Sequence, residues 1–129
     1  MNKEELAAAA RTAAEMSYSP YSNFRVGAVV VAANGEVFQG ANVENASYPL
    51  TSCAETTAIN AAVSQGIRKI DTVAVACIDA ADTEGSYPCG GCRQKMAEFK
   101  VDKVIVTSGE GSVIREHTLE ELLPHQFNL

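Results

Sequence analysis

Apolar positions follow a helical period near the start of the chain and form short continuous runs farther along. Residues 3 to 16 are rich in Ala, Glu and Leu and lack Gly and Pro, which predicts an amphipathic helix. Apolar runs over residues 25 to 33 and 36 to 43 flank Asn34 and Gly35. This dipeptide favours a hairpin, because Asn and Gly tolerate the positive φ of a type I′ turn.

Helical and strand-like patterns alternate over the rest of the chain. The expected elements are a helix over 54 to 64, a strand over 71 to 78, a helix from 89 to near 100, strands over 104 to 107 and 112 to 115, and a short helix over 118 to 122. Thr51 or Ser52 can cap the first of these helices, and Gly66 can end it. This order predicts a mixed sheet covered by helices, an α/β fold, in one domain over residues 1–129.

The net charge of the chain disfavours nucleic acids as binding partners. The 16 acidic and 10 basic residues give a net charge of -6. A DNA or RNA backbone normally needs clustered Lys and Arg, so a small uncharged or weakly cationic substrate is expected instead of a polynucleotide. The apolar runs are far shorter than the roughly 20 residues that span a bilayer. The first residues lack the features of a secretory signal, so a cytoplasmic location is expected.

The chain has four cysteines. In a reducing compartment cysteines favour metal or redox chemistry over disulfides. Cys77 lies in an apolar run and is expected to be a small core residue. His117 and His125 have no motif spacing to the cysteines, and surface or packing roles are expected for both.

The other three cysteines have the spacing of a catalytic zinc site. Cys53 opens the sequence Cys-Ala-Glu, and Cys89 and Cys92 lie in Pro-Cys-Gly-Gly-Cys. Three protein ligands leave the fourth tetrahedral position open for water. Glu55 follows Cys53 by two residues and could handle the proton of that water, whose pKa falls to about 7 in favourable sites. These residues predict hydrolytic deamination.

This pattern matches the zinc deaminase signature of His or Cys, any residue, Glu, then Pro-Cys-x-x-Cys. Other segments resemble the small free-nucleoside cytidine deaminases in the same order: residues 20 to 28, 40 to 48, 88 to 94 and 121 to 124. The resemblance implies a three-layer helix-sheet-helix fold with a mixed central sheet and one zinc per subunit. It also implies deamination of cytidine and 2′-deoxycytidine to uridine and 2′-deoxyuridine, with release of ammonia, in pyrimidine salvage.

The resemblance assigns substrate contacts as well. Asn42 and Glu44 lie two apart on an expected strand, so their side chains share a face and suit sugar hydroxyls. The family pattern gives them that role, with Phe24 stacking on the pyrimidine and the backbone amide of Ala54 holding the base. Taken without the family pattern, the pair would be interpreted as polar residues flanking a turn.

Two further aromatic residues bear on assembly. The family's counterpart of Phe127 reaches the pocket of a neighbouring subunit, which implies a homotetramer with shared active sites. Tyr48 either contributes to such a shared pocket or is an ordinary buried tyrosine.

Two positions beside the zinc ligands depart from the family pattern. Thr56 stands where many three-cysteine members carry Arg, so Arg93 and the helix starts at the ligand segments would offset the net charge of three thiolates on Zn²⁺. Tyr87 stands where the family more often has Ser. It either reshapes the pocket near the leaving amino group or, as we expect, turns outward from an acidic loop.

The same residues are compatible with other functions. The substrate could be a modified cytosine nucleoside or a cytosine antibiotic such as blasticidin S. The chain could instead be a noncatalytic zinc module in which Cys77 or another residue completes a four-coordinate site, although Glu55 would then have no role. Editing of polynucleotides is disfavoured by the acidic charge.

Overall fold

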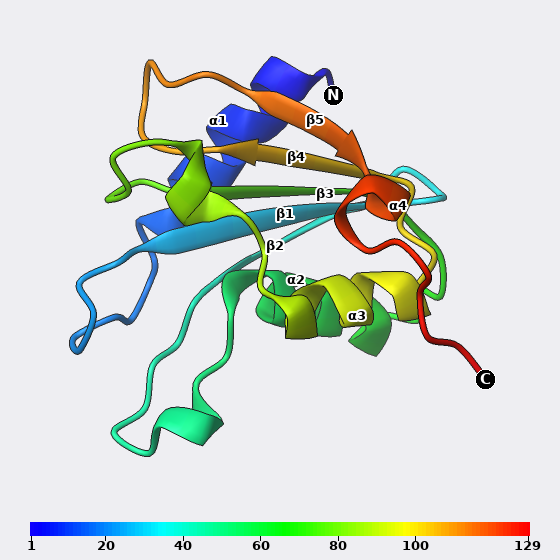
Figure 1. Ribbon diagram of the computed structural model, residues 1–129, viewed down its shortest axis with the longest axis horizontal. Coiled ribbons are helices and arrows are strands. Elements are labelled where there is room, and N and C mark those ends of the chain that lie inside the picture. The colour runs from blue at the N-terminus through cyan, green and yellow to red at the C-terminus, as the bar shows by residue number, and fades with distance from the viewer.

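The computed structural model describes residues 1–129 as a five-stranded sheet with helices on both faces (Figure 1). The elements are α1 (Lys3–Ala14), β1 (Val26–Ala32), β2 (Val37–Ala41), the 3₁₀-helix η1 (Tyr48–Leu50), α2 (Ala54–Ser64), β3 (Ile70–Cys77), the 3₁₀-helix η2 (Thr83–Ser86), α3 (Gly90–Glu98), β4 (Lys103–Thr107), β5 (Arg115–Thr118) and α4 (Leu119–Leu122). None of these helices has the length and apolar character needed to cross a bilayer.

The sheet has the strand order β2-β1-β3-β4-β5. Strands β3 and β4 run parallel, and the other neighbouring pairs run antiparallel. The sheet is therefore mixed and covered by helices, as expected from the sequence, and the three-layer fold that the resemblance implies is confirmed.

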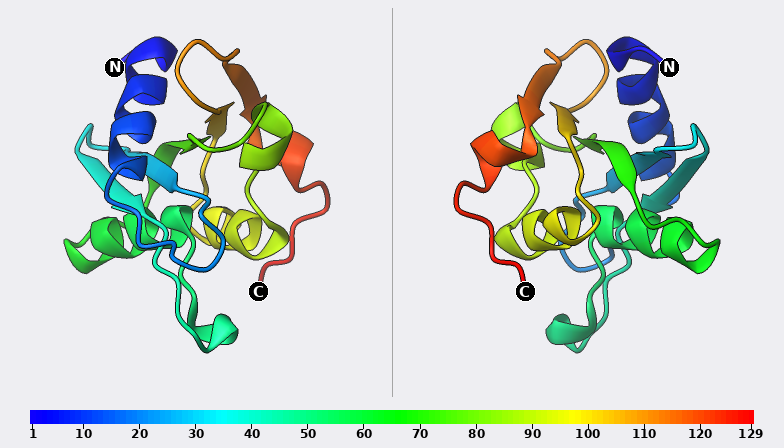
Figure 2. Two further views of the ribbon diagram at one scale, coloured as in Figure 1. Left: turned by 90° about the vertical axis from the view of Figure 1, so that its left-hand side faces the viewer. Right: turned by 90° about the vertical axis from the view of Figure 1, so that its right-hand side faces the viewer.

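The central strands are buried on both faces because each face has its own helical layer. Helix α1 covers one face, and α2 and α3 cover the other (Figure 2). Along β1, Ala28 and Val30 belong to the core beneath α2 and α3, whereas Val29 packs with Leu6 and Ala10 of α1. This burial explains why β1 reads as a continuous apolar run instead of an alternating one.

The hairpin is present, but the expected type I′ turn is wrong. Gly35 has a φ of +90°, whereas Asn34 is not among the residues with positive φ. The amide of Gly35 donates to the carbonyl of Ala32 (2.9 Å), and the amide of Ala32 donates to the carbonyl of Glu36 (2.8 Å). These bonds describe a three-residue loop in which a type I turn is followed by a left-handed glycine and a bulge.

Two other expectations need correction. The N-cap of α2 is Cys53, with no side-chain capping bond, and not Thr51 or Ser52. The last strand begins at Arg115 and not at Ser112. Ser112 belongs to a turn, because its hydroxyl accepts a hydrogen bond from the amide of Ser108 (3.0 Å) and its amide donates to the carbonyl of Gly109 (3.1 Å).

Candidate active site

Two helix starts bring three cysteines together. Cys53 is the N-cap of α2, Cys89 is the N-cap of α3, and Cys92 lies in the first turn of α3. Their sulfur atoms all lie within 4.8 Å of one another. Helices α2 and α3 lie side by side on one face of the sheet (Figure 1), so residues that are far apart in the sequence meet at one point.

The donor set fits zinc. Zinc–sulfur bonds of about 2.3 Å in a tetrahedron place two sulfurs about 3.8 Å apart, which agrees with this spacing. Neither cysteine N-cap makes a side-chain capping bond, so amides of both first turns remain free to stabilise thiolates. Three sulfurs leave one position of a tetrahedron open.

The thiols of Cys53 and Cys92 lie close enough together to shift each other's pKa. The hydrogen bond with Cys53, followed by burial, raises the pKa of the Cys92 thiol. The same hydrogen bond lowers the pKa of Cys53. Metal binding at such a pair releases the proton, so metal affinity at this site will increase with pH.

Glu55 occupies the second position of α2 and is only 4% exposed. Burial raises the pKa of its carboxyl group. No other side chain forms a salt bridge or hydrogen bond with this carboxyl group. A buried carboxyl group with a raised pKa can exchange a proton nearer to neutral pH than an exposed glutamate can, which suits an acid-base catalyst.

Asn42 lies just beyond the end of β2 and is buried. Its side-chain oxygen accepts hydrogen bonds from the amide of Val26 (3.0 Å) and from the hydroxyl of Ser17. Its side-chain nitrogen donates to the carbonyl of Phe24 (2.9 Å). Asn42 therefore fixes the backbone on both sides of Arg25, and the half-exposed ring of Phe24 with it.

Glu44 lies on the same side of the chain as Asn42, because the intervening Val43 faces solvent. One carboxylate oxygen accepts from the amides of Tyr21 (2.9 Å) and Ser22 (3.1 Å), and the other accepts from the Ser22 hydroxyl (2.5 Å). Hydrogen bonding, first of all from the Ser22 hydroxyl, lowers the pKa of Glu44, so the group is ionised at neutral pH.

Glu44 also lines a cavity of about 430 Å³ together with Tyr21, Ser22, Tyr48 and Thr51. Tyr48 is 71% exposed, so the alternative of an ordinary buried tyrosine is wrong. Its ring meets that of Tyr21 edge to face, with 6.2 Å between centroids.

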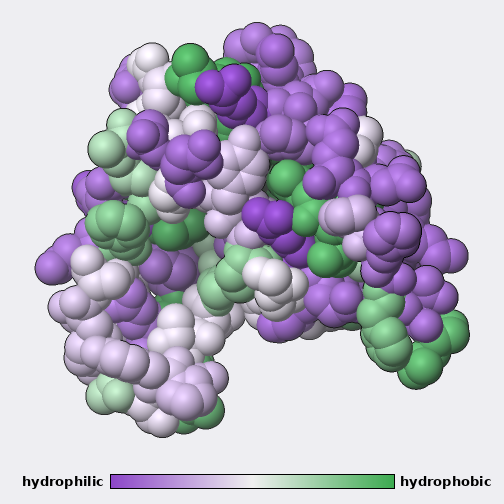
Figure 3. Space-filling view, viewed as in Figure 1, coloured by the Kyte–Doolittle hydropathy of each residue, from purple (hydrophilic) through white to green (hydrophobic).

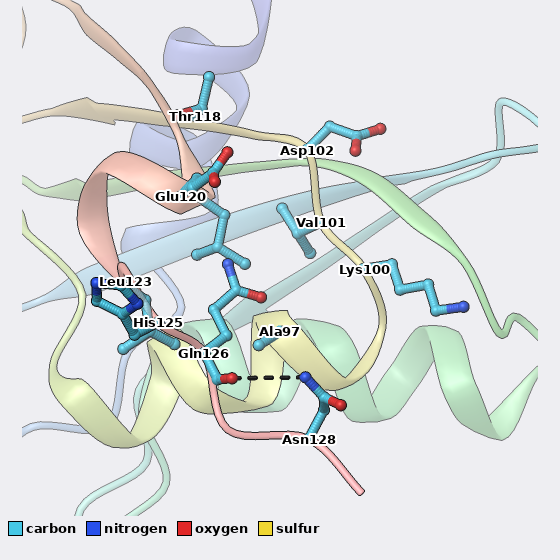
Figure 4. A pocket seen from close by; sticks show the side chains of 11 residues that line it. Ala97, Lys100, Val101, Asp102, Thr118, Glu120, Leu123, His125, Gln126 and Asn128 are labelled. Carbon is cyan, nitrogen blue, oxygen red and sulfur yellow. Dashed lines mark hydrogen bonds between the residues drawn. The ribbon is translucent and has the colours of Figure 1, made fainter.

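A larger cavity, of about 690 Å³, lies between α3, α4 and the C-terminal segment. Figure 4 shows its lining, where the Asn128 side-chain amide donates to the carbonyl of Gln126 (3.5 Å). None of the residues expected at the active site lines it. Phe127 is 67% exposed, and its carbonyl accepts a hydrogen bond from the Gln94 side chain (3.2 Å).

A lysine is present near the sulfurs in addition to the expected Arg93 and helix starts. Arg93 directs its guanidinium to the carbonyls of Pro88 (2.8 Å) and Leu122 (2.7 Å). Thr56 is 8% exposed, and its hydroxyl lies 3.6 Å from the sulfur of Cys92. The ammonium of Lys95 donates to that hydroxyl (3.0 Å). Sequence reasoning missed Lys95, although a position three residues after Cys92 lies on the same helix face.

Tyr87 does not turn outward as expected. Its side chain is half-buried against the core, and its hydroxyl lies 2.7 Å from Nε2 of His117. The packing role expected for His117 is therefore present. Cys77 is fully buried in β3 and lies outside the three-cysteine cluster, as expected for a core residue.

Comparisons with known proteins agree with this geometry. A family model described as the cytidine and deoxycytidylate deaminase zinc-binding region matches residues 1–108. The cytidine deaminase of Sporosarcina psychrophila is 44% identical over 131 residues, which cover 99% of this chain and 93% of that relative. The crystal structure of cytidine deaminase from Burkholderia pseudomallei is 42% identical with a TM-score of 0.89, covering 98% of this chain and all of that one.

A more distant relative bears on the alternative substrate. The blasticidin-S deaminase of Bacillus cereus is 32% identical over 107 residues, which cover 79% of this chain and 76% of that protein. The family model spans most of the sequence, and relatives match it over nearly its full length. The chain therefore belongs to the cytidine and deoxycytidylate deaminase family.

Proposed function

We propose that this protein is a zinc-dependent deaminase that converts cytidine and 2′-deoxycytidine, with water, to uridine and 2′-deoxyuridine and ammonia. Residues 1–129 act as one deaminase domain, in the cytoplasm, for pyrimidine salvage. The observation that carries the proposal is the meeting of Cys53, Cys89 and Cys92 at two helix starts, with the buried carboxyl group of Glu55 in the same helix turn.

Cys53, Cys89 and Cys92 would hold the metal. When bound, zinc supplies the Lewis acidity that makes a water molecule nucleophilic near neutral pH. The Glu55 carboxylate takes a proton from the attacking water and delivers it to the ring nitrogen of cytosine. Water adds its oxygen to the amino-bearing carbon, Glu55 carries the second proton to the amino group, and ammonia leaves.

Asn42 and Glu44 each retain one hydrogen-bonding position that suits a sugar hydroxyl. The Asn42 amide nitrogen has two N–H groups and uses one toward Phe24. The Glu44 carboxylate has about four acceptor sites and uses three. The remaining donor and acceptor support binding of the sugar, while Phe24 stacks on the pyrimidine and the free amide of Ala54 contacts the base.

Exposed apolar side chains support a homotetramer with shared active sites. Tyr48, Leu50 and Phe127 are each about two-thirds exposed or more. The segment that carries η1 projects from the body of the molecule, and hydrophobic surface is present at the C-terminal end (Figure 3). In the proposed assembly these side chains are covered, with Phe127 and Tyr48 reaching pockets of neighbouring subunits.

The test is the loss of ultraviolet absorbance when zinc-quantified protein is mixed with cytidine, 2′-deoxycytidine or blasticidin S. We expect both nucleosides to be converted. The Glu55→Gln variant should keep its zinc and lose about 10²- to 10⁴-fold in turnover, the usual contribution of a general acid-base group. Zinc-loaded protein that converts only blasticidin S would support the alternative substrate. Normal turnover by zinc-loaded Glu55→Gln would remove the proposed mechanism.

A further inference from the structure

We propose that Lys95 and Thr56 form a hydrogen-bond relay to the Cys92 sulfur and act as positioning residues of the zinc site. The inference rests on the proposed zinc site and identifies what offsets its charge in this chain. The two side chains hydrogen-bond to each other and to Cys92, and to none of the proposed substrate contacts, so the effect is on the metal and its ligands.

Three elements of geometry support the relay. Thr56 lies in α2, one turn after Cys53, and Lys95 lies in α3, one turn after Cys92. The Lys95 ammonium is 3.0 Å from the Thr56 hydroxyl oxygen, and that oxygen is 3.6 Å from the Cys92 sulfur. Thr56 and Cys92 are both buried, whereas Lys95 is exposed.

The chemistry of the three groups fixes the direction of the hydrogen bonds. An ammonium group can only donate, and a threonine hydroxyl has one proton to donate and two lone pairs to accept. Because Lys95 donates to the oxygen of Thr56, the hydroxyl proton is free to point at the Cys92 sulfur. Hydrogen bonds in such a chain polarise one another, so the ammonium strengthens the bond from the hydroxyl to the thiolate.

The relay also offsets the negative charge of the zinc site. Three thiolates around one Zn²⁺ carry a formal charge of -1, and hydrogen bonds to the ligands commonly hold such a charge in place. The Arg93 guanidinium donates its hydrogen bonds to the carbonyls of Pro88 and Leu122, and not to a cysteine sulfur. Lys95 is therefore the cation that hydrogen-bonds toward the cluster. The Thr56 hydroxyl connects Lys95 to the Cys92 sulfur, and Lys95 supplies the positive charge that a threonine lacks.

The experiment compares wild-type protein with Thr56→Val, Thr56→Ser, Lys95→Met and the Thr56→Val/Lys95→Met double variant. Zinc release to a coloured chelator is followed in each, and the sulfur-to-cobalt charge-transfer band is recorded after replacement of zinc by Co²⁺. Thr56→Val keeps the shape of threonine and should speed zinc release roughly 10-fold, the lower range for loss of a bond to a metal ligand. Lys95→Met should give about 2- to 5-fold, because Lys95 is exposed.

The double variant separates a relay from two independent effects. If Lys95 acts through the Thr56 hydroxyl, adding Lys95→Met to Thr56→Val changes neither zinc release nor the cobalt band. Thr56→Ser restores the hydroxyl and should restore wild-type behaviour. Lys100→Met removes an exposed lysine just beyond the end of α3, which makes no side-chain hydrogen bond, and should have no effect.

Two results would overturn the relay. One is a Thr56→Val protein whose zinc release and cobalt band equal those of the wild type. The other is a Lys95→Met effect of the same size with and without the Thr56 hydroxyl, which would mean that the charge acts directly through space. A wild-type protein that binds no zinc would instead remove the proposed function itself, so the two failures are distinguishable.

Discussion

The hydroxyl of Tyr87 and Nε2 of His117 lie 2.7 Å apart, and this bond joins the residue before Pro88 to strand β5. The other ring nitrogen of His117 lies 3.3 Å from the carboxylate of Glu121 at the start of α4. The loop that carries Cys89 is therefore tied to the C-terminal part of the fold by side chains as well as by packing.

Loss of the Tyr87 hydroxyl should lower stability without altering the ring. Tyr87→Phe removes a partly buried hydrogen bond and is expected to reduce the free energy of unfolding by about 1 kcal/mol. Urea denaturation of the zinc-loaded protein measures the change. Tyr18→Phe, at an exposed tyrosine whose side chain makes no hydrogen bond, is the matched control and should match the wild type. Equal stability of both variants would mean that water replaces the His117 contact.

The pair formed by Arg25 and Asp79 should make stability fall in acid. Their side chains meet at 2.8 Å, beside β1 and beyond the end of β3. Hydrogen bonding by the guanidinium holds the pKa of Asp79 below its usual range. A lowered pKa means that the pair stabilises the fold above the ordinary Asp pKa of about 4 and loses this effect as pH falls through the lowered value.

The comparison of wild-type protein with Asp79→Asn tests this assignment. The stability difference should be largest near neutral pH and should shrink as pH falls below about 4. We expect a small difference, because both side chains are partly exposed and water screens the interaction. Denaturation midpoints across the pH range provide the measurement. A difference that is constant with pH would show that ionisation of Asp79 is not involved.

Glu44→Gln should weaken substrate binding more than it slows the chemistry. The amide lacks acceptor sites that the carboxylate offers to Ser22 and to a sugar hydroxyl. Loss of a hydrogen bond to a charged group predicts a rise in KM for cytidine of roughly 10-fold or more, with a smaller change in kcat. Glu98→Gln, at an exposed glutamate of α3, serves as the control. A fall in kcat alone would place Glu44 in the chemical step instead.

Substitutions at two glycines should distinguish the stability of the fold from the stability of the metal site. A Cβ at Gly40 would lie 2.5 Å from the amide nitrogen of Ala58, so Gly40→Ala should push α2 away from β2. A Cβ at Gly27 would lie 2.1 Å from the carbonyl of Ala10 in α1, on the opposite layer. Both changes should cost about 1–3 kcal/mol or more.

Only Gly40→Ala should also loosen zinc, because α2 carries Cys53. Melting temperature and zinc content of the purified variants measure the two effects. Gly27→Ala protein that is folded but zinc-poor would contradict this separation of the layers.

Local patterns in the sequence determined the class of fold and the kind of chemistry. The apolar runs on either side of Asn34-Gly35 located the hairpin, and Gly66, with a φ of +94°, ends the helix that the sequence predicted. These features depend on backbone preferences and periodicity within a few residues, so they can be predicted from the local sequence alone. Three cysteines and a glutamate in a distinctive spacing were likewise sufficient to indicate a zinc deaminase.

Contacts between distant segments were decided only by the tertiary structure. Thr56 and Lys95 are 39 positions apart, and Tyr87 and His117 are 30 apart. The start of β5 also depended on pairing, since Arg115 lies opposite Val106 of β4. Sheet register and helix packing set these contacts, and both depend on the whole core. The sequence therefore determined which residues could bind zinc, while the packing of α2 against α3 decided which side chains surround it.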